Sequence, residues 1–511
     1  MPKFHVLRKT YRDSVTLMQL ASKLARLPGI SNASASMATP ANLDLLREAG
    51  TDVGSVQAGP NDLLIMLEGE PAAVDAALAE AQKLLSDRGE SEELGERAAG
   101  QKRAPRSIAM ALAEARAGLA LISVPGEYAA AEALKAVNLG LNVMLFSDNV
   151  ALADEVMLKR QADARGLIVM GPDCGTAIIG GVPLAFANKV RAGPIGLVGA
   201  SGTGLQQVTV LIDRAGSGIT QAIGTGGRDL KQEVGGLSML AGLRALAADP
   251  DTRVIVLISK PPAPEIAQRI LGEARRAGKP VVVNFLGAQT AAVSGGNLHG
   301  AHTLDDAARA AVALAEGRAP GQAPLPAAAG SLPKLAPEQR YVRGLYSGGT
   351  FCYEATLLLL EAEIGEVHSN THVGRARDLA DPWRSEGHTL VDLGDDVFTR
   401  GRPHPMIDHR LRNERIVQEA ADPSVAVILL DVVLGYGSHP DPAAEMRAAL
   451  SQARDLARKA GREIAFVGQV CGTEADPQNL NRQSAALAGM GMLLANSNAQ
   501  AVRLAARIVQ R

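Results

Sequence analysis

Two short segments combine glycines with hydroxyl side chains in a way that suits the binding of an anion. They are LVGASGTGLQQV (197–208) and YSGGTFCYEAT (346–356), and each places a glycine-rich turn between a strand-like and a helix-like run. Glycine lets the backbone approach a ligand closely, and the first N–H groups of a helix attract anions. A plain tight turn is the alternative at both segments. The residues expected to bind phosphate or substrate here are Ser201, Gly202, Thr203, Gly204, Gly348, Gly349, Thr350 and Cys352.

Three further polar loops follow strand-like runs, at residues 171–176, 224–229 and 470–474. Because ligands collect at the carboxyl ends of strands in open α/β sheets, we expect these loops to reach the same edge. They add Gly226, Gly227, Gly472 and Thr473 to the residues expected to bind phosphate or substrate.

Charged residues near these loops are the candidates for catalysis. Lys260, at a strand end, offers a point charge for an anionic substrate, and Arg228 offers a fork for a carboxylate or phosphate. Asp173, Asp229 and Glu474 are candidate acid or base groups. A surface ion pair or a helix cap explains any one of the residues at these loops equally well.

Cys174, Cys352 and Cys471 are the three cysteines of the chain, and each lies in a loop of this kind. They are too few for a disulfide framework and lack the spacing of a zinc site, so we expect no metal. A nucleophilic role lacks an adjacent histidine, and small residues that fill tight loops are the favoured interpretation.

Composition indicates a multidomain α/β protein. The 511 residues are too many for one core and suggest three or four domains, and 53 glycines fit many tight strand-to-helix turns. A formal charge of -2 gives no reason to expect nucleic acid or an anionic membrane as a partner. With no apolar run of membrane length and no secretory signal at the start, we expect a cytoplasmic protein.

The order of helix-like and strand-like runs predicts several Rossmann-like or flavodoxin-like domains with parallel sheets, after a small α+β unit at residues 1–95. A charged stretch at 86–106 is expected to be a linker. Strand and helix patterns alternate over 105–190, over 194–318 and again over 340–511. The Ala- and Pro-rich segment 319–339 is predicted to be a linker between two functional halves.

The segment from Gly193 to Asp229, with SVPGEYAAAEALKAVNLGLNVMLFSD and VMGPDCGTAI before it, resembles the α subunit of succinyl-CoA synthetase over about 200 residues. The C-terminal part, with LVDLGDD, DPSVAVILLDVVLGYG and FVGQVCGTEADPQNLNRQSAALAGMGMLLANS, resembles the carboxyl-terminal domain of that enzyme's β subunit. This order in one chain, without an ATP-grasp part, is similar to the FdrA family.

The resemblance implies that two helix N-termini, one from each half, face the same phosphate, and that a histidine carries a phosphoryl group. The corresponding region here offers His299 and His302, of which His302 is the catalytic candidate. The acidic segment that orients the histidine in the family is replaced by residues 258–262, ISKPP, so the carboxylate support is missing. Exposed or capping histidines are the alternative.

The family is associated with two chemistries, acyl-CoA ligation and carbamoyl transfer. No ATP-grasp part, no G-x-x-x-x-G-K-[ST] loop and no G-x-x-G-x-x-G turn in the N-terminal unit is recognisable, which leaves ATP unsupported and CoA doubtful. Our first prediction is therefore a carbamoyltransferase subunit that moves a carbamoyl group between a ureido acid such as oxalurate and phosphate, as in purine degradation, with phosphate as a substrate and no cofactor.

The alternatives are an acyl-CoA ligase or transferase that works with a nucleotide-binding partner, and a non-catalytic scaffold subunit. We expect other subunits or a homo-oligomer as partners. Residues 398–415, FTRGRPHPMIDHRLRNER, gather His404, Asp408, His409 and several arginines, which we interpret as a solvated helix start in preference to a metal site.

Overall fold

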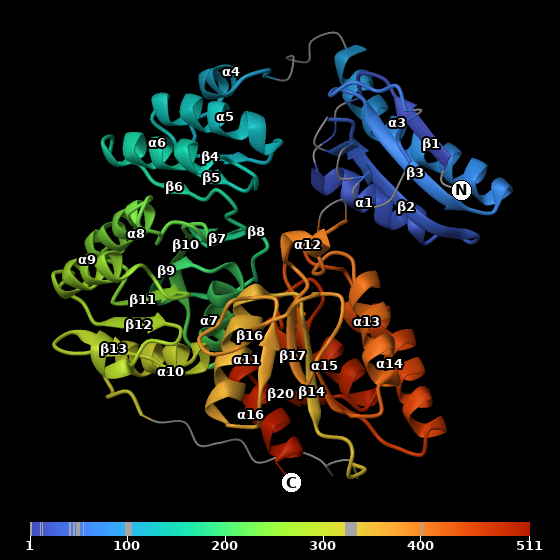
Figure 1. The fold of residues 1–511 in the computed structure, drawn as a ribbon. Helices are drawn as coiled ribbons and strands as arrows, with labels where there is room; N and C mark the ends of the chain where they lie inside the picture. The colour runs from blue at the N-terminus through green and yellow to red at the C-terminus, as the bar shows by residue number, and fades with distance from the viewer. Residues whose placement is uncertain are drawn as a thin grey trace. The chain divides into compact units, whose positions relative to one another are not determined.

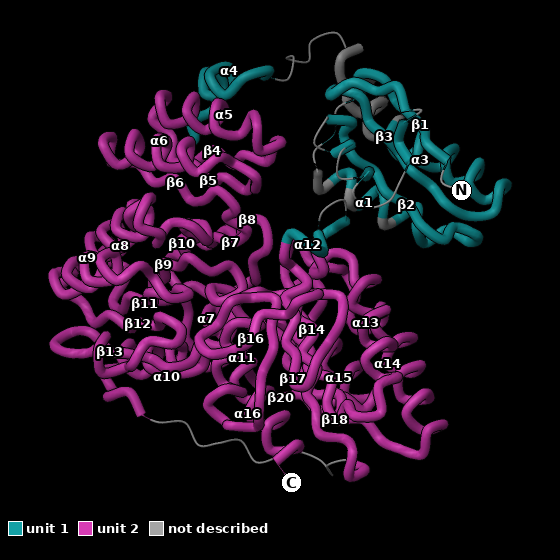
Figure 2. Tube along the Cα trace, in the orientation of Figure 1, with its two compact units in different colours: residues 1–117, 396–403 teal, residues 118–395, 404–511 magenta. Residues whose placement is uncertain are grey.

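The computed structural model of this chain contains two compact units, residues 1–117 with 396–403 and residues 118–395 with 404–511 (Figure 2). The structure describes all residues except 1–2, 11, 13, 40–41, 44–45, 48–51, 55, 98–104, 322–334, 400–401 and 511. Most of the predicted linker 319–339 lies outside the described residues. The finer domain boundaries expected from the sequence stay predictions.

The smaller unit is the α+β unit that the sequence predicts. Its three strands pair antiparallel in the order β1-β3-β2. Alternate residues of β3 pack with α1 and α3 in one core, so both helices cover the same face of the sheet. Strand β1 is an addition to the prediction, and α3 continues to Arg97, into the stretch expected to be a linker. The elements are β1 (Lys3–Leu7), α1 (Ser14–Ala25), β2 (Ile30–Met37), β3 (Leu63–Gly69), α3 (Pro71–Arg97), α4 (Ile108–Glu114) and α12 (Asp396–Thr399).

The larger unit begins with a three-stranded parallel sheet in the order β4-β5-β6. Helices alternate with the strands, as predicted for parallel βαβ units. The elements are β4 (Leu119–Ile122), α5 (Gly126–Asn138), β5 (Asn142–Leu145), α6 (Leu152–Asp163) and β6 (Val169–Met170).

A seven-stranded sheet follows, in the order β13-β12-β11-β9-β10-β7-β8. Strands β9 to β13 are parallel, and the antiparallel hairpin β7-β8 extends the sheet beside β10. The strands are β7 (Thr176–Ile179), β8 (Val182–Ala185), β9 (Ala192–Ala200), β10 (Ile219–Gly224), β11 (Val254–Ser259), β12 (Val281–Phe285) and β13 (Leu298–Gly300). The helices are α7 (Gly202–Arg214), α8 (Leu237–Ala248), α9 (Pro264–Arg275), η1 (Thr290–Val293) and α10 (Leu304–Ala315).

The C-terminal half forms a second seven-stranded sheet, in the order β16-β15-β17-β14-β18-β19-β20, with all neighbours parallel. The strands are β14 (Tyr341–Tyr346), β15 (Val367–Ser369), β16 (Arg377–Asp378), β17 (His388–Asp392), β18 (Val425–Val433), β19 (Ala465–Cys471) and β20 (Leu493–Ala495). The helices are α11 (Gly349–Glu361), α13 (Arg410–Ala421), α14 (Pro442–Lys459), α15 (Leu480–Gly489) and α16 (Asn498–Val509).

Both seven-stranded sheets contain the flavodoxin-like strand order, which confirms the predicted fold class. The order reverses at β9, which lies between β10 and β11, and at β14, which lies between β17 and β18. Ligands bind at such reversals, at the carboxyl ends of the strands. The strands β9 and β14 lead directly into α7 and α11, so the two glycine-rich turns lie at these reversals.

A shared apolar core fixes these two turns relative to one another. Helices α7, α10, α11 and α16 pack together between the two large sheets, as Figure 1 shows, and contribute Leu205, Ala307, Phe351 and Val502, all fully buried or nearly so, to one hydrophobic cluster. The N-termini of α7 and α11 are thereby held by well-packed side chains.

None of the described helices has the length and apolar character that a membrane crossing requires.

Candidate functional site

The N-termini of α7 and α11 meet in the larger unit. Ser201 caps α7, and its hydroxyl accepts a hydrogen bond from the Gly204 N–H at 3.0 Å. The same oxygen lies 2.7 Å from the Thr350 Oγ1 in the first turn of α11. The predicted pair of loops thus forms one arrangement, which we call the cradle and define as residues 201–204 and 348–350.

Four backbone N–H groups remain available at the cradle. Among the hydrogen bonds of the described residues, none is donated by the N–H of Gly202, Thr203, Gly349 or Thr350. The N–H groups just before α11 are already used, because Ser347 and Gly348 both donate to the Asp431 carboxylate at 2.8 Å. Free donors at a helix start attract anions, so two adjacent helix starts suit the predicted binding of an anion.

The glycines of the cradle are required by close approaches. A Cβ on Gly348 would lie 2.9 Å from Thr203 Cγ2, and one on Gly349 would lie 2.4 Å from Asp392 Oδ2. Gly202 differs, since it is exposed and its Cβ would meet only Thr176, at 3.2 Å from Oγ1. A larger residue there would occupy the open side of the cradle and leave the packing of the two helices intact.

Two charged groups lie beside the α11 side of the cradle. Lys260 follows β11, and its Nζ lies 5.6 Å from the centroid of the Tyr353 ring. Asp392 ends β17, beside β14, and burial raises the pKa of its carboxyl group to about 6 although Lys260 acts to lower it. The predicted Lys260 is therefore placed near the cradle, whereas the sequence did not suggest Asp392 as a site residue.

His404 lies close to the same loop. A Cβ on Gly394 would be 2.9 Å from His404 Nε2 and 3.1 Å from Asp392 Oδ1. Burial lowers the pKa of His404 to about 4, so the ring is neutral at neutral pH. Its ring contacts that of Phe186, with centroids 5.8 Å apart. His404 was weighed only as part of a metal site, and its place beside Asp392 was missed.

The three cysteines are buried thiols. Burial raises the pKa of Cys174 to about 12 and also raises those of Cys352 and Cys471. Cys352 is 0% exposed, so its side chain does not reach a ligand in the cradle. The expectation that Cys352 binds phosphate or substrate stays a prediction. The interpretation as loop-filling residues fits Cys174, whereas Cys352 lies in α11 and Cys471 ends β19.

Arg228 belongs to an ion-pair network away from the cradle residues. Its Nε bonds to Glu155 at 2.9 Å and its Nη2 donates to the Val150 carbonyl at 2.8 Å. Lys159, 1% exposed, lies between Glu155 (2.9 Å) and Asp229 (2.8 Å). The network joins α6 of the first sheet to the loop after β10, so Arg228 and Asp229 have structural partners.

The remaining predicted loop residues are placed in two groups. Gly226 packs on the 171–172 loop, since its Cβ would be 2.4 Å from the Pro172 carbonyl oxygen, while Asp173 and Gly227 are exposed. Gly472 and Thr473 are buried, and their loop is held by Arg214, which donates to the Gly472 carbonyl at 2.9 Å. No hydrogen bond of the described residues joins Gly227, Gly472 or Thr473 to the cradle.

The histidines suggested as phosphoryl carriers do not contact the cradle. His302 Nε2 lies 2.9 Å from Glu361 Oε2, at the last residue of α11, and the 13 residues of that helix place its two ends roughly 18 Å apart. His299 lies in β13, at the edge of its sheet. The geometry therefore brings together Ser201, Gly202, Thr203, Gly204, Gly348, Gly349, Thr350 and Lys260, but not His302.

The pair formed by His302 and Glu361 gives a pH-dependent prediction. Glu361 raises the pKa of His302, with burial opposing, so the pair stabilises the fold below pH 6.5 and loses this effect as the pH rises through the folded-state pKa. Since both side chains are exposed by more than a third, His302→Asn is expected to lower the free energy of unfolding by less than about 0.5 kcal/mol at pH 5.5. At pH 8.5 the variant should equal the parent in urea denaturation. An equal loss at both pH values would contradict this origin.

Residues 398–415 were interpreted as a solvated helix start, and α13 does begin there at Arg410, but the described part of the segment is largely buried instead of solvated. Arg412 and Arg415 of α13 are 1% and 2% exposed. Arg412 Nη1 lies 3.1 Å from Asp431 Oδ1, and Arg415 Nη2 lies 2.8 Å from Glu419 Oε1. The charges are buried because each finds a carboxylate inside the fold. The described residues contain no group of three or more His, Cys, Asp or Glu side chains that could hold a metal ion.

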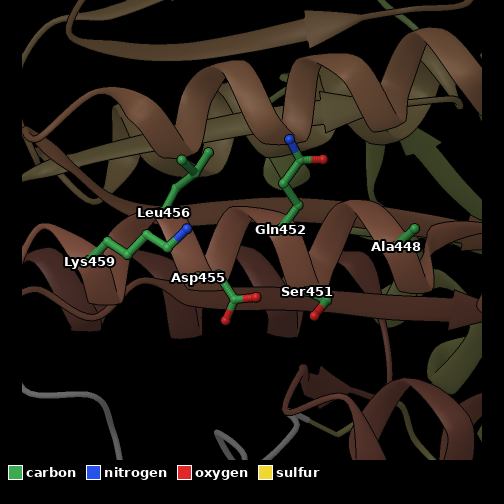
Figure 3. Close-up of a pocket in the computed structure, with 6 residues that line it drawn as sticks. All are labelled: Ala448, Ser451, Gln452, Asp455, Leu456 and Lys459. Carbon is green, nitrogen blue, oxygen red and sulfur yellow. The ribbon is translucent and has the colours of Figure 1, made fainter.

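Two hollows elsewhere in the described part of the chain are not lined by cradle residues. Figure 3 shows one along α14, lined by Ala448, Ser451, Gln452, Asp455, Leu456 and Lys459, all on a single helix. A second, in the smaller unit, is lined by Gly29, Ile30, Ser31, Glu68, Gly69 and Glu70.

Models of two protein families match the two halves of the cradle. The model described as CoA binding domain matches residues 190–287, which include α7, and the one described as CoA-ligase matches residues 345–508, which include α11. A third, described as AllF, heavy metal-associated domain, matches residues 1–103, in which no cysteine occurs.

The fold and these matches define a succinyl-CoA synthetase-like protein of the CoA-binding and CoA-ligase type. The chain belongs to the family of the uncharacterized protein YahF of Escherichia coli (strain K12), with 42% identity over 506 residues, 98% of this chain and 97% of the relative. The FdrA name itself stays a prediction.

More distant relatives match parts of the chain. The ADP-forming sulfoacetate-CoA ligase subunit SauD of Bilophila wadsworthia is 27% identical over 195 residues, which cover 36% of this chain and 64% of that subunit. Among solved structures, the dinucleotide-forming acetyl-coenzyme A synthetase 1 of Ca. Korarchaeum cryptofilum aligns over 80% of this chain and 88% of its own, with 14% identity and a TM-score of 0.34.

These findings correct the prediction of a carbamoyltransferase. The matching family models and named ligase relatives are of the CoA-ligase type, which overturns carbamoyl transfer as the main function. They also weaken the objection to CoA, which rested on a missing glycine turn in the first unit, because the CoA-binding match covers a later segment. The alternative of an acyl-CoA ligase fits better.

Proposed function

We propose that this chain is a subunit of an acyl-CoA ligase that transfers an acyl group between phosphate and CoA. The observation that carries the proposal is the 2.7 Å contact of Ser201 with Thr350, which joins the helix N-terminus of the CoA-binding match to that of the CoA-ligase match. One phosphoryl group could then accept hydrogen bonds from both helices.

The cradle suits the negative charge that develops on phosphate in this reaction. When the thiol of CoA attacks an acyl phosphate, the C–S bond forms, the thiol proton passes to solvent, the C–O bond to phosphate breaks, and negative charge collects on the departing phosphate. Free N–H groups at Gly202, Thr203, Gly349 and Thr350 are fixed donors for that charge. Lys260 adds a cation beside them.

A separate chain that binds the nucleotide completes the proposal. The matching families are described as CoA binding domain and CoA-ligase, the sequence has no P-loop, and the relative SauD is itself named as a subunit of an ADP-forming ligase. We therefore expect this chain to act with a partner subunit when ATP is made or used. Without the partner, it should still catalyse the exchange between acyl-CoA and phosphate.

Gly202→Val tests the cradle in this function. The exposed position leaves the packing intact, but the added side chain fills the open side of the cradle, so phosphate-dependent release of CoA thiol from an acyl-CoA should fall by about 100-fold. The matched control is Gly272→Val, at an open position on α9 where a Cβ meets nothing within 4 Å. A thiol reagent measures the release over a panel of acyl-CoA compounds.

Binding of CoA decides the wider proposal. Isothermal titration of the purified chain with CoA should show saturable binding in the parent and in both glycine variants. Absence of CoA binding would contradict the ligase function, and full activity of Gly202→Val would remove the cradle from it.

A further inference from the structure

Asp392 presents an unpartnered carboxylate oxygen to the cradle. The residue is 9% exposed, and its Oδ1 accepts a hydrogen bond from the Gly394 N–H at 2.9 Å. In the described part of the chain, Oδ2 accepts none, and it lies so close to Gly349 that an added Cβ there would be 2.4 Å away. An acceptor oxygen on a side chain that is about nine-tenths buried therefore lies at the first turn of α11 without a hydrogen-bond partner among the described residues.

Charged groups from several elements surround this carboxylate. Lys260, after β11, favours its ionised form, whereas Asp395 in its own loop and Asp431 of β18 disfavour it. His404 is neutral in the physiological range because burial lowers its pKa, and the Cys352 thiol on α11 is held protonated by burial. Burial has the largest effect and raises the pKa of Asp392 to about 6, so the free site is mostly ionised at pH 7.5.

An ionised Asp392 conflicts with an anion in the cradle. The four free N–H groups attract negative charge, yet Oδ2 carries negative charge at the edge of the same site. In a partly buried site such repulsion is only weakly screened. A proton on Oδ2 removes the repulsion and turns the acceptor into a hydrogen-bond donor.

We propose that Asp392 takes up a proton when an anion occupies the cradle, so that a phosphate-like dianion and a proton bind together. The proton passes from solvent to Oδ2 when the anion binds, and it returns to solvent when the anion leaves. The proposal rests on the anion site of the proposed function and identifies Asp392 as the residue that makes its affinity depend on pH.

Sulfate is the probe, because it keeps two negative charges across the range in which phosphate titrates. Isothermal titration of the full chain between pH 5.5 and 8 should show an affinity that falls by up to about tenfold per pH unit above pH 6. At pH 7.5, titration in two buffers of different ionisation enthalpy should show uptake approaching one proton per sulfate.

Asp392→Asn removes the titrating group and keeps its shape. Its sulfate affinity should not change between pH 6.5 and 8, and at pH 8 should exceed that of the parent by at least about tenfold. The control Asp455→Asn, an exposed aspartate on α14, should keep the parental slope. Lys260→Met gives a second test. Because Lys260 lowers the pKa of Asp392, the sulfate affinity of this variant should begin to fall at a higher pH than that of the parent.

The possible failures are distinct. If neither sulfate nor phosphate binds at any pH, the cradle is not an anion site, and both this proposal and the phosphate part of the proposed function fall. If sulfate binds with a flat pH profile, or if Asp392→Asn keeps the slope, the role of Asp392 is overturned and the cradle stands.

Discussion

Replacing Arg412 by methionine is expected to lower the free energy of unfolding by about 3–5 kcal/mol. Arg412 is 1% exposed and lies between the Asp431 carboxylate, at 3.1 Å, and His409. Methionine fills much of the space but leaves Asp431 charged and without its cation inside the fold. Urea denaturation at pH 7 measures the loss.

Two comparisons separate the buried charge from general damage. Arg410→Met, at a partly exposed arginine of the same helix that pairs with Asp408, should cost less than about 1 kcal/mol. Adding Asp431→Asn to Arg412→Met should recover part of the loss because it removes the unpaired charge. The recovery is partial because Ser347 and Gly348 donate to different carboxylate oxygens, and asparagine replaces one of these with an NH₂ group. If the double variant were less stable than Arg412→Met by as much as Asp431→Asn alone lowers the free energy of unfolding of the parent, the two effects would be additive and the ion pair would be contradicted.

Lys159→Met should destabilise the larger unit by a similar amount, about 3–5 kcal/mol. The Lys159 ammonium forms ion pairs with Glu155 (2.9 Å) and Asp229 (2.8 Å) and donates a hydrogen bond to the Thr225 carbonyl at 2.9 Å. Glu155 and Asp229 are both 0% exposed, so without Lys159 each carboxylate loses a buried cation. Only Glu155 keeps a second cation, Arg228. Thermal and urea unfolding measure the loss.

The exposed Lys459 provides the control. Lys459→Met, at the end of α14, should change the free energy of unfolding by less than about 0.5 kcal/mol. If Lys159→Met were equally mild, water would have to reach the two carboxylates and the network would not be buried in solution.

The glycine-rich turns were predictable because their chemistry is local. A strand, glycines, hydroxyls and a helix start occur within a dozen residues at 197–208 and again at 346–356, and the local pattern already implies free N–H donors. The alternation of strands and helices likewise gave the fold class. The contact of Ser201 with Thr350 followed only from the resemblance, since nothing local relates two turns 149 positions apart.

Asp392 and the buried arginines were not predictable in this way. Asp392 reaches the cradle because β17 lies next to β14, and strand order is a property of the whole sheet. Arg412 and Arg415 were interpreted as solvated because charged residues of a helix usually are. Their partners, Asp431 and Glu419, show that a charge-rich helix can face inward where carboxylates meet it.

The predicted chemistry failed for a different reason. Carbamoyl transfer was chosen because an ATP site and a glycine turn were not recognised in the sequence. The fold could not correct this choice, because one fold supports several reactions. The CoA-binding match at 190–287 covers residues 201–204 of the cradle and not the N-terminal unit, so the missing turn in that unit was weak evidence against CoA.

The contact between Ser201 and Thr350 has a consequence for how the anion site assembles. Its two halves belong to one polypeptide and are held by one apolar core, so they meet at a high effective concentration that dilution does not change. Each chain should therefore carry one complete anion site, and the number of sulfate ions bound per chain should be the same in nanomolar as in millimolar protein.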